Sequence, residues 1–268
     1  MINKRMILAI AIIALIGFSM ASCEDSTEEG SSKDYDYTEN NGKITITKYK
    51  GTGGNITIPS NIGGKPVTSI GNQAFTDSGI TSITIPDSVT RIGDESFFRC
   101  SSLSSAIIGN GIKSIGDYAF YLCTSLTSII IPDSVNSIGE QVFWQCTSLA
   151  SVNISNNITT IKRNTFQHCT SLASVTIPNG VTTIEKEAFS GCIGFTSIII
   201  PSSVNKIEEG AFAGCTNLNS VTFQGTINKS NFNGTAFDDW LYDTFYATNS
   251  TNGTQGTYTR NGSTWTKN

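Results

Sequence analysis

The residues of this 268-residue chain with most chemical potential are seven cysteines and one histidine. Six cysteines recur every 23 residues, and only Cys23 lies outside this register. In an exported chain, seven cysteines could form a disulfide framework. Equivalent positions of stacked repeats point the same way, however, whereas a disulfide needs Cβ atoms that face each other about 3.8 Å apart. We therefore expect six free, buried thiols: Cys100, Cys123, Cys146, Cys169, Cys192 and Cys215.

The sequence contains few residues that could form a catalytic site or a metal site. There is no Cys-x-x-Cys pair and no histidine cluster, so we expect no metal site and no cofactor. His168 adjoins Cys169, but its repeat position is variable, and we expect no catalytic role for it. The 17 basic residues are outnumbered by 21 acidic ones, and no basic stripe could displace phosphate counterions. These features predict a non-catalytic protein that binds no nucleic acid.

The N-terminus has the features of an export signal with a lipid attachment site. A basic start precedes the apolar run of residues 6–18, which is too short to span a bilayer as a helix of about 20 residues. Small residues before Cys23 resemble the bacterial lipobox, although an ordinary cleavage site is the alternative. We assign residues 1–22 to a lipoprotein signal peptide and residues 23–41 to an acidic, flexible tether. The lipid would be the only contact with the membrane.

Beyond the tether, a 23-residue pattern is repeated seven times. Apolar residues at repeat positions 4 and 6 alternate with polar ones, which is typical of a strand buried on one face. Proline at position 7 ends that strand, and a second short strand follows at positions 10–13. Gly93, Gly116 and Gly139 at position 14 predict a tight bend. The Phe-x-x-Cys segment at positions 18–21 predicts one helical or 3-10 turn. The repeats start at Ile80, Leu103, Leu126, Leu149, Leu172, Phe195 and Leu218.

A single repeat cannot bury its own apolar side chains, so the repeats must stack into a solenoid of parallel strands over residues 42–224. A hairpin turning at Asn41-Gly42 would cover the first coil. Residues 225–268 would form the C-terminal cap, a short helix followed by a β-hairpin that pairs Tyr258 with Trp265. The helix is predicted from Thr235 as its N-cap and from an apolar face of Phe237, Trp240, Leu241 and Phe245.

Residues 126–139, followed by Phe143 and Cys146, resemble the repeat unit of the BspA-like leucine-rich-repeat family of bacterial surface proteins. The resemblance covers residues 55–223. It implies a leucine-rich-repeat solenoid of the α/β horseshoe class, mostly β with short helical or 3-10 turns, which binds partner macromolecules and contributes no catalytic residues. Some repeats depart from the pattern: Gly109, Ser155 and Gln224 replace proline, and Lys162, Glu185 and Glu208 replace glycine.

Two sets of side chains are candidates for partner binding. Ile107, Ile130 and Ile199 at position 5 should point outward from the main sheet, which in solenoids is the usual concave recognition face. Three aromatic residues at position 19 either pack over the turns or form a ridge that anchors an interface. They are Phe98, Tyr121 and Trp144.

We expect a monomeric, lipid-anchored protein on the outer cell surface that binds a protein or extracellular-matrix ligand on host or neighbouring cells. The alternative is a structural envelope lipoprotein of the periplasm, which would associate with itself or with a cell-wall polymer.

Overall fold

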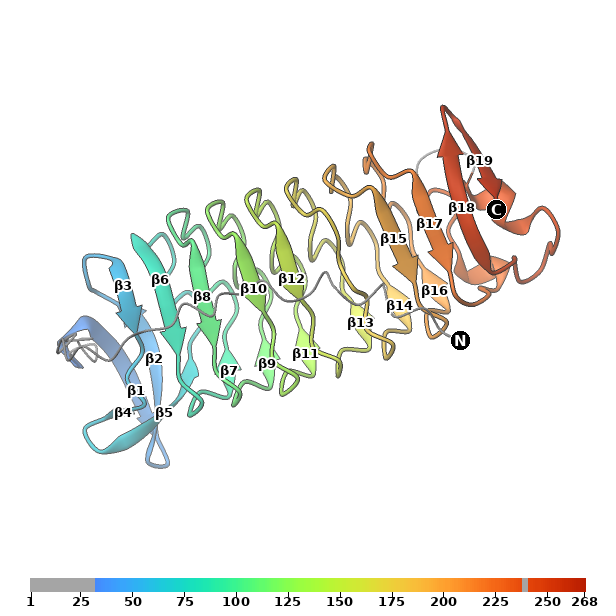
Figure 1. Cartoon of the computed structure of the whole chain (residues 1–268). Helices are drawn as coiled ribbons and strands as arrows, with labels where there is room; N and C mark the ends of the chain where they lie inside the picture. Colours follow the sequence, from blue (N-terminus) through green and yellow to red (C-terminus); the bar gives the residue numbers. More distant parts are fainter. Residues whose placement is uncertain (1–31, 238–240) are drawn as a thin grey trace, which may run out of the picture.

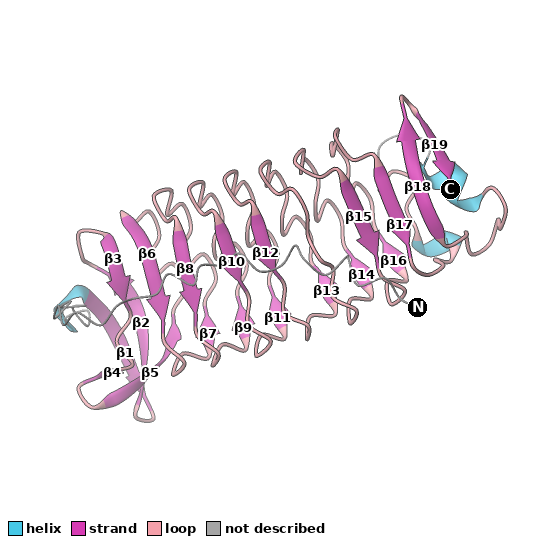
Figure 2. Cartoon of the chain, viewed as in Figure 1, coloured by secondary structure: helices cyan, strands magenta, loops and turns pink. Residues whose placement is uncertain are grey.

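The computed structural model describes residues 32–237 and 241–268. The signal peptide, Cys23 and Trp240 lie outside the described residues. Figure 1 shows an elongated stack of similar coils that runs from an N-terminal cap to a C-terminal cap. In Figure 2 strands and loops make up almost all of the stack, and the helices lie at its ends. The fold is therefore a mostly-β solenoid of parallel coils, as the repeat predicts.

One face of the solenoid, which we call the long-strand face, carries the strands at repeat positions 3–6. Neighbouring strands pair in parallel with a 23-residue offset, so Ser128 lies opposite both Ser105 and Ser151. Position 4 points into the core, as Ile83 and Ile129 do. The strands are β3 (Gly54–Thr57), β6 (Ile80–Ile85), β8 (Ser105–Ile108), β10 (Ser128–Ile130), β12 (Ser151–Asn153), β15 (Ser197–Ile200) and β17 (Ser220–Phe223).

A second face, the short-strand face, is built from two-residue strands at positions 12–13, whose isoleucines point inward. The glycines that follow do not make the bend through left-handed φ angles, which corrects the expectation for position 14. A Cβ at Gly116 would lie 2.6 Å from the Asp94 amide nitrogen, so glycine is needed there for close approach between coils. The strands are β7 (Arg91–Ile92), β9 (Ser114–Ile115), β11 (Ser137–Ile138), β13 (Thr160–Ile161), β14 (Thr183–Ile184) and β16 (Lys206–Ile207).

The third face consists of turns where the sequence predicts a helical or 3-10 turn. Left-handed φ angles recur at positions 16 and 20, for example 58° at both Tyr118 and Leu122, and they rule out a helix. Along these turns, some main-chain N–H groups donate to the next coil and others donate within their own coil. Phe97 N–H donates to the Ala119 carbonyl of the next coil at 2.8 Å, whereas Cys100 N–H donates to Phe97 within its own coil at 3.2 Å. The turns therefore form a ladder of their own.

Stacked phenylalanines fill the core beneath this turn face. The rings of Phe97 and Phe120 lie 5.0 Å apart, and those of Phe120 and Phe143 lie 5.6 Å apart, with interplanar angles of 14° and 10°. Aromatic rings in such offset stacks contribute beyond the area that they bury. The column runs through Phe75, Phe97, Phe120, Phe143, Phe166, Phe189, Phe212 and Phe237.

The six repeat cysteines are free and buried, which confirms the expectation, and each has a specific partner. The Cys146 thiol donates to the Phe120 carbonyl of the preceding coil at 3.2 Å. The other five make the same bond at 3.0–3.3 Å. Burial raises the pKa of the Cys146 thiol to about 12. The column of thiols thus gives each of these turn carbonyls a second hydrogen bond.

An antiparallel hairpin, β1 (Tyr35–Asn40) and β2 (Lys43–Tyr49), covers the N-terminal end, with Asn41-Gly42 in its turn. β2 continues the stack by pairing in parallel with β5 (Lys65–Ile70), against which β4 (Asn61–Ile62) folds back. A short 3-10 helix, η1 (Ser32–Asp34), precedes the hairpin. The ordered cap therefore begins inside residues 23–41, the segment expected to be a tether, because Tyr35 is buried against the core.

The C-terminal cap differs in detail from the prediction. Among the described residues α1 spans Leu241–Tyr246. Thr235 lies in a turn where its amide and hydroxyl groups donate to Asn233 Oδ1, and Ala236 and Phe237 after it are not helical, so Thr235 is not the helix N-cap. Phe237, Leu241 and Phe245 are buried as expected. η2 (Lys229–Asn231) precedes α1.

The terminal hairpin is formed by β18 (Gly256–Asn261) and β19 (Thr264–Lys267), and β18 extends the long-strand face by pairing with β17. Its register is shifted from the predicted one, because Trp265 pairs with Arg260 and Tyr258 pairs with Lys267. The turn is Gly262-Ser263, with φ of 64° at Gly262. Glycine at the first central position of a two-residue turn explains the shift.

The two strand ladders are interrupted in different coils near the middle of the solenoid. The short-strand ladder breaks between β11 and β13, whereas the long-strand ladder breaks between β12 and β15, and we call the long-strand break the junction. At the junction the short-strand ladder continues, because β14 pairs with both β13 and β16. The turn ladder also continues there, since Phe166 N–H donates to the Ala188 carbonyl at 2.8 Å. The two parts of the long-strand face are therefore held together by the other two faces and the core.

Candidate functional site

The long-strand face presents the isoleucines predicted to point outward. Ile107, Ile130 and Ile199 are 61%, 58% and 54% exposed, although most large apolar side chains of the described residues are buried. Because β8 and β10 are neighbours in register, Ile107 and Ile130 lie one strand spacing apart, about 4.8 Å. Ile199 lies across the junction, on β15. The structure thus brings together two of the three isoleucines.

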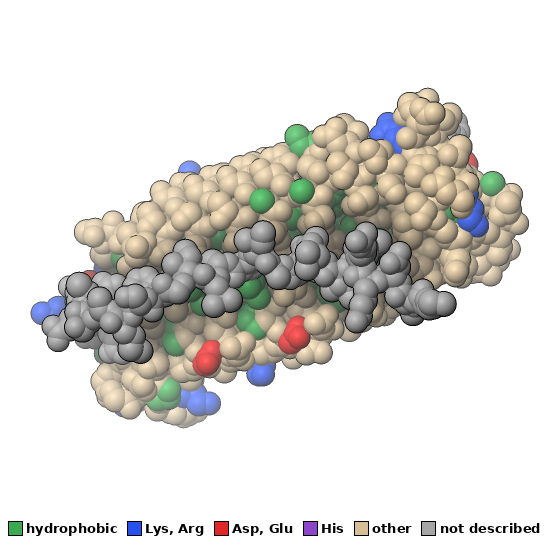
Figure 3. All heavy atoms as spheres, in the orientation of Figure 1, with side chains coloured by type: hydrophobic (Ala, Val, Ile, Leu, Met, Phe, Trp, Pro, Cys, Tyr) green, Lys and Arg blue, Asp and Glu red, His purple; other side chains and the backbone are tan. Residues whose placement is uncertain are grey.

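The surroundings of these isoleucines carry no charge. Outward positions 3 and 5 of the strands hold serine, threonine, asparagine or isoleucine, and Figure 3 shows few charged side chains on the visible surface. An uncharged strip with an apolar pair gives little electrostatic steering. The outward side chains are Ser82, Thr84, Ser105, Ile107, Ser128, Ile130, Ser151, Asn153, Ser174, Thr176, Ser197, Ile199, Ser220 and Thr222.

The three aromatic residues of position 19 lie on the turn face, away from the isoleucines. Tyr121 stacks between the other two, with ring centroids 4.9 Å from Phe98 and 4.5 Å from Trp144 and interplanar angles of 7° and 6°. Trp144 Nε1 donates to Gln167 Oε1 at 2.7 Å. Burial raises the pKa of Tyr121. Since the Tyr121 ring has a neighbour on each face, this geometry favours packing between coils over partner binding.

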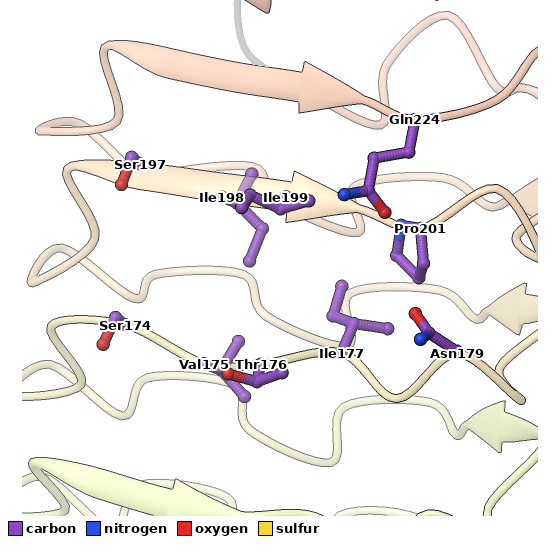
Figure 4. Close-up of a pocket in the computed structure, with 10 residues that line it drawn as sticks. All are labelled: Ser174, Val175, Thr176, Ile177, Asn179, Ser197, Ile198, Ile199, Pro201 and Gln224. Atoms are coloured by element: carbon purple, nitrogen blue, oxygen red, sulfur yellow. The ribbon is translucent and has the colours of Figure 1, made fainter. Parts of the chain in front are cut away.

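Beside Ile199 the long-strand face contains a hollow of about 330 Å³, which the repeat pattern does not predict. Figure 4 shows it between β15 and the preceding coil, with Asn179 and Gln224 at one end. Val175 is half-buried here, whereas Ile83 and Ile129, its counterparts on β6 and β10, are buried. The sequence gives no signal for the hollow, because valine also occupies this repeat position at Val152 and Val221. The lining residues are Ser174, Val175, Thr176, Ile177, Asn179, Ser197, Ile198, Ile199, Pro201 and Gln224.

The cysteine and histidine side chains that could take part in a reaction are in contact with neighbouring coils. The Cys169 thiol donates to the Phe143 carbonyl at 3.1 Å, and burial raises its pKa well above the ordinary value. His168 is half-buried, has φ of 59° and meets the Trp144 ring edge-on. Within residues 32–237 and 241–268, no group of three or more His, Cys, Asp or Glu residues could hold a metal ion. In the same part of the chain, no helix is long and apolar enough to cross a membrane.

A solenoid of 23-residue parallel coils with one long-strand face defines a leucine-rich-repeat protein. The chain belongs to the BspA type leucine-rich-repeat family, whose model matches six copies over residues 68–193 and 147–252. It is a repeat protein of the bacterial surface-protein type, a class that generally provides protein-binding scaffolds.

Two solved structures are similar in both sequence and fold. The leucine-rich-repeat protein of T. pallidum is 32% identical, with a TM-score of 0.66 over 71% of this chain and 91% of that one. A leucine-rich cell surface protein of Faecalibacterium prausnitzii is 36% identical, with a TM-score of 0.67 over 74% of this chain. The match spans 55% of the F. prausnitzii chain. No curated protein sequence matches this chain.

Proposed function

We propose that this protein is a lipid-anchored, non-catalytic binding protein of the cell surface, which captures protein partners through its long-strand face. The single observation that carries the proposal is the exposure of Ile107 and Ile130 side by side on an uncharged strip. A contiguous apolar patch rimmed by polar residues is typical of an interaction site.

The energetics of this face favour apolar anchoring. Complete burial of an isoleucine side chain stabilises a complex by about 1.5–3 kcal/mol, so Ile107 and Ile130 together could supply a substantial part of a micromolar affinity. With no charged residue at the outward strand positions, adhesion should depend only weakly on salt concentration.

Attachment to the cell is proposed to run through Cys23. The apolar run of residues 6–18 and the small residues before Cys23 support signal-peptide cleavage and diacylation there. The segment that follows is acidic and would be repelled by anionic headgroups, so the lipid must supply the membrane affinity. The similarity to a cell surface protein of F. prausnitzii supports display outside the cell.

The test of the proposed site compares two multiple variants in adhesion of cells to extracellular-matrix proteins and to neighbouring cells. Ile107→Asp combined with Ile130→Asp should weaken adhesion at least roughly tenfold and leave the melting temperature nearly unchanged, because both side chains point to solvent.

The matched variant replaces Phe98, Tyr121 and Trp144 with serine. It should lower the melting temperature, because it removes a stack of rings, and the surviving folded protein should still adhere. Loss of adhesion in this variant at an unchanged melting temperature, with adhesion kept in the isoleucine variant, would refute the proposed site. Proteolysis on intact cells tests the location, since a periplasmic protein would be protected.

A further inference from the structure

The hollow beside Ile199 lies where the long-strand ladder is broken. At repeat position 2, main-chain bonds otherwise link successive coils. Ala150 N–H donates to the Thr127 carbonyl at 2.9 Å, and Asn219 N–H donates to the Thr196 carbonyl at 3.0 Å. Ala173 lies midway between these two pairs, and no bond joins it to either neighbouring coil within the described structure.

The missing bonds extend along the whole segment of residues 173–177. Among the described residues, none makes a main-chain hydrogen bond to this segment, and no strand pairs with it. Buried main-chain amide and carbonyl groups are almost always paired in proteins, so an unpaired strand-like segment beside a hollow has hydrogen-bonding capacity to offer.

The side chains around the hollow extend this capacity without adding charge. The amides of Asn179 and Gln224 are exposed at one end, and neither makes a side-chain hydrogen bond within the described part of the chain. Hydroxyl groups of Ser174 and Ser197 lie at the other end, as Figure 4 shows. Val175, half-buried, gives the hollow an apolar wall.

We propose that the hollow binds a short extended segment of a partner polypeptide, which pairs its main chain with residues 173–177 and with the Asn179 and Gln224 amides. This is strand addition, in which main-chain hydrogen bonds supply affinity and side-chain pockets supply specificity. The volume of about 330 Å³ is near the lower end of the range for ligand pockets and fits a short segment rather than a folded element.

The lining argues against other ligand classes. It contains no charged residue to hold an ion and no aromatic ring on which a sugar could stack. The unpaired main chain of residues 173–177, in contrast, could pair with the main chain of a peptide. The inference rests on the proposed function in taking the partner to be a protein. It concerns residues separate from Ile107 and Ile130, so the two can fail independently.

The first measurement is amide hydrogen exchange of the purified full chain. Amides of residues 173–177 should exchange at least about a hundredfold faster than those of Thr127, Ala150 and Asn219, because only the latter are paired. Equal protection of the two groups would overturn the proposal, since the segment would then offer no free main-chain groups.

The second measurement uses a displayed library of random linear dodecapeptides as the probe. Peptides selected on the full chain should lose at least tenfold in affinity on the variant Asn179→Ala with Gln224→Ala, and they should bind normally to the control Asn136→Ala with Asn205→Ala, which alters exposed asparagines elsewhere. N-methylation of alternate main-chain nitrogens in a selected peptide should abolish binding, and binding should slow amide exchange in residues 173–177.

The outcomes separate this site from the isoleucine pair. Unchanged binding to Ile107→Asp with Ile130→Asp supports the hollow as a distinct site. If binding is lost only in that isoleucine variant, the hollow proposal is overturned and the proposed function stands. Failure to select any peptide, equal binding of N-methylated peptides, or capture of an oligosaccharide through Asn179 and Gln224 would each overturn it.

Discussion

The buried cysteines predict a loss of stability that two replacements of Cys146, by alanine and by the non-natural 2-aminobutyric acid, divide into a packing part and a hydrogen-bond part. The Cys146 side chain is fully buried, and its thiol donates to the Phe120 carbonyl at 3.2 Å. Alanine removes the sulfur atom and the hydrogen bond, whereas 2-aminobutyric acid, which carries a methyl group in place of the thiol, nearly keeps the volume and removes only the donor. The Phe120 carbonyl also accepts the Cys123 amide proton at 3.2 Å, so neither variant leaves it without a partner.

The magnitudes follow from these contacts. Since a thiol is a weak donor and the carbonyl keeps one bond, loss of the hydrogen bond should cost about 0.5–1 kcal/mol. Removal of one buried heavy atom costs about 0.8 kcal/mol in transfer free energy, and the cavity adds to it. The free energy of unfolding should therefore fall by about 0.5–1 kcal/mol when 2-aminobutyric acid replaces Cys146 and by about 1.5–2 kcal/mol for Cys146→Ala.

The assay is urea unfolding followed by circular dichroism, with amide exchange beside it because long repeat arrays can unfold in more than one step. Ser128→Ala, at an exposed outward position, is the control and should stay within about 0.5 kcal/mol of the original chain. If the chain with 2-aminobutyric acid at position 146 is as stable as the original chain while Cys146→Ala loses its full amount, the thiol acts only as a small hydrophobic group and the hydrogen-bond argument fails.

Three further predictions concern the thiols, the coil spacing and the anchor. Burial raises the pKa of Cys146 from its ordinary value near 9 to about 12, so the free energy of unfolding should be unchanged below pH 9 and should fall as the pH rises toward 12. The repeat thiols of the folded protein should resist iodoacetamide at pH 8, and all six should react in urea. Detection of three disulfides instead would contradict the packing of the thiols. Gly116→Ala should lower the free energy of unfolding by about 1–3 kcal/mol, because the added Cβ would lie 2.6 Å from the Asp94 nitrogen. In the control Gly180→Ala the added Cβ would lie 3.2 Å from its nearest neighbour, so the loss should be much smaller. Similar losses in the two variants would show that coil spacing does not require glycine. Labelled palmitate should enter the original chain and not Cys23→Ala, and equal labelling of both would exclude Cys23 as the anchor.

The 23-residue period was sufficient to predict the solenoid, its inward side chains and the exposure of Ile107 and Ile130. These features follow from which residues are apolar and how they are spaced, and a stacked array has one way to bury them. The six buried thiols were predictable for the same reason.

Features that depend on hydrogen bonds between coils could not be predicted from that pattern. The thiol bond to Phe120 needs the position of a carbonyl in another coil, and the left-handed turn at Tyr118 occurs at a residue type that seldom adopts it. The hollow depends on bonds that fail to form at residues 173–177, although the sequence there repeats the common strand pattern. The shifted register of Trp265 depends on whether Gly262 stands first or second in the hairpin turn, which the sequence does not decide.

The central claim, that the long-strand face contacts the partner, is tested most directly by site-specific photo-cross-linking on intact cells. The photoreactive amino acid p-benzoylphenylalanine would replace Ile107 on the long-strand face, Tyr121 on the turn face or Ser137 on the short-strand face, one at a time. Irradiation in the presence of matrix proteins or neighbouring cells should give a covalent adduct with a protein from position 107 and none from positions 121 and 137. An adduct from position 121 or 137, with none from position 107, would contradict the account.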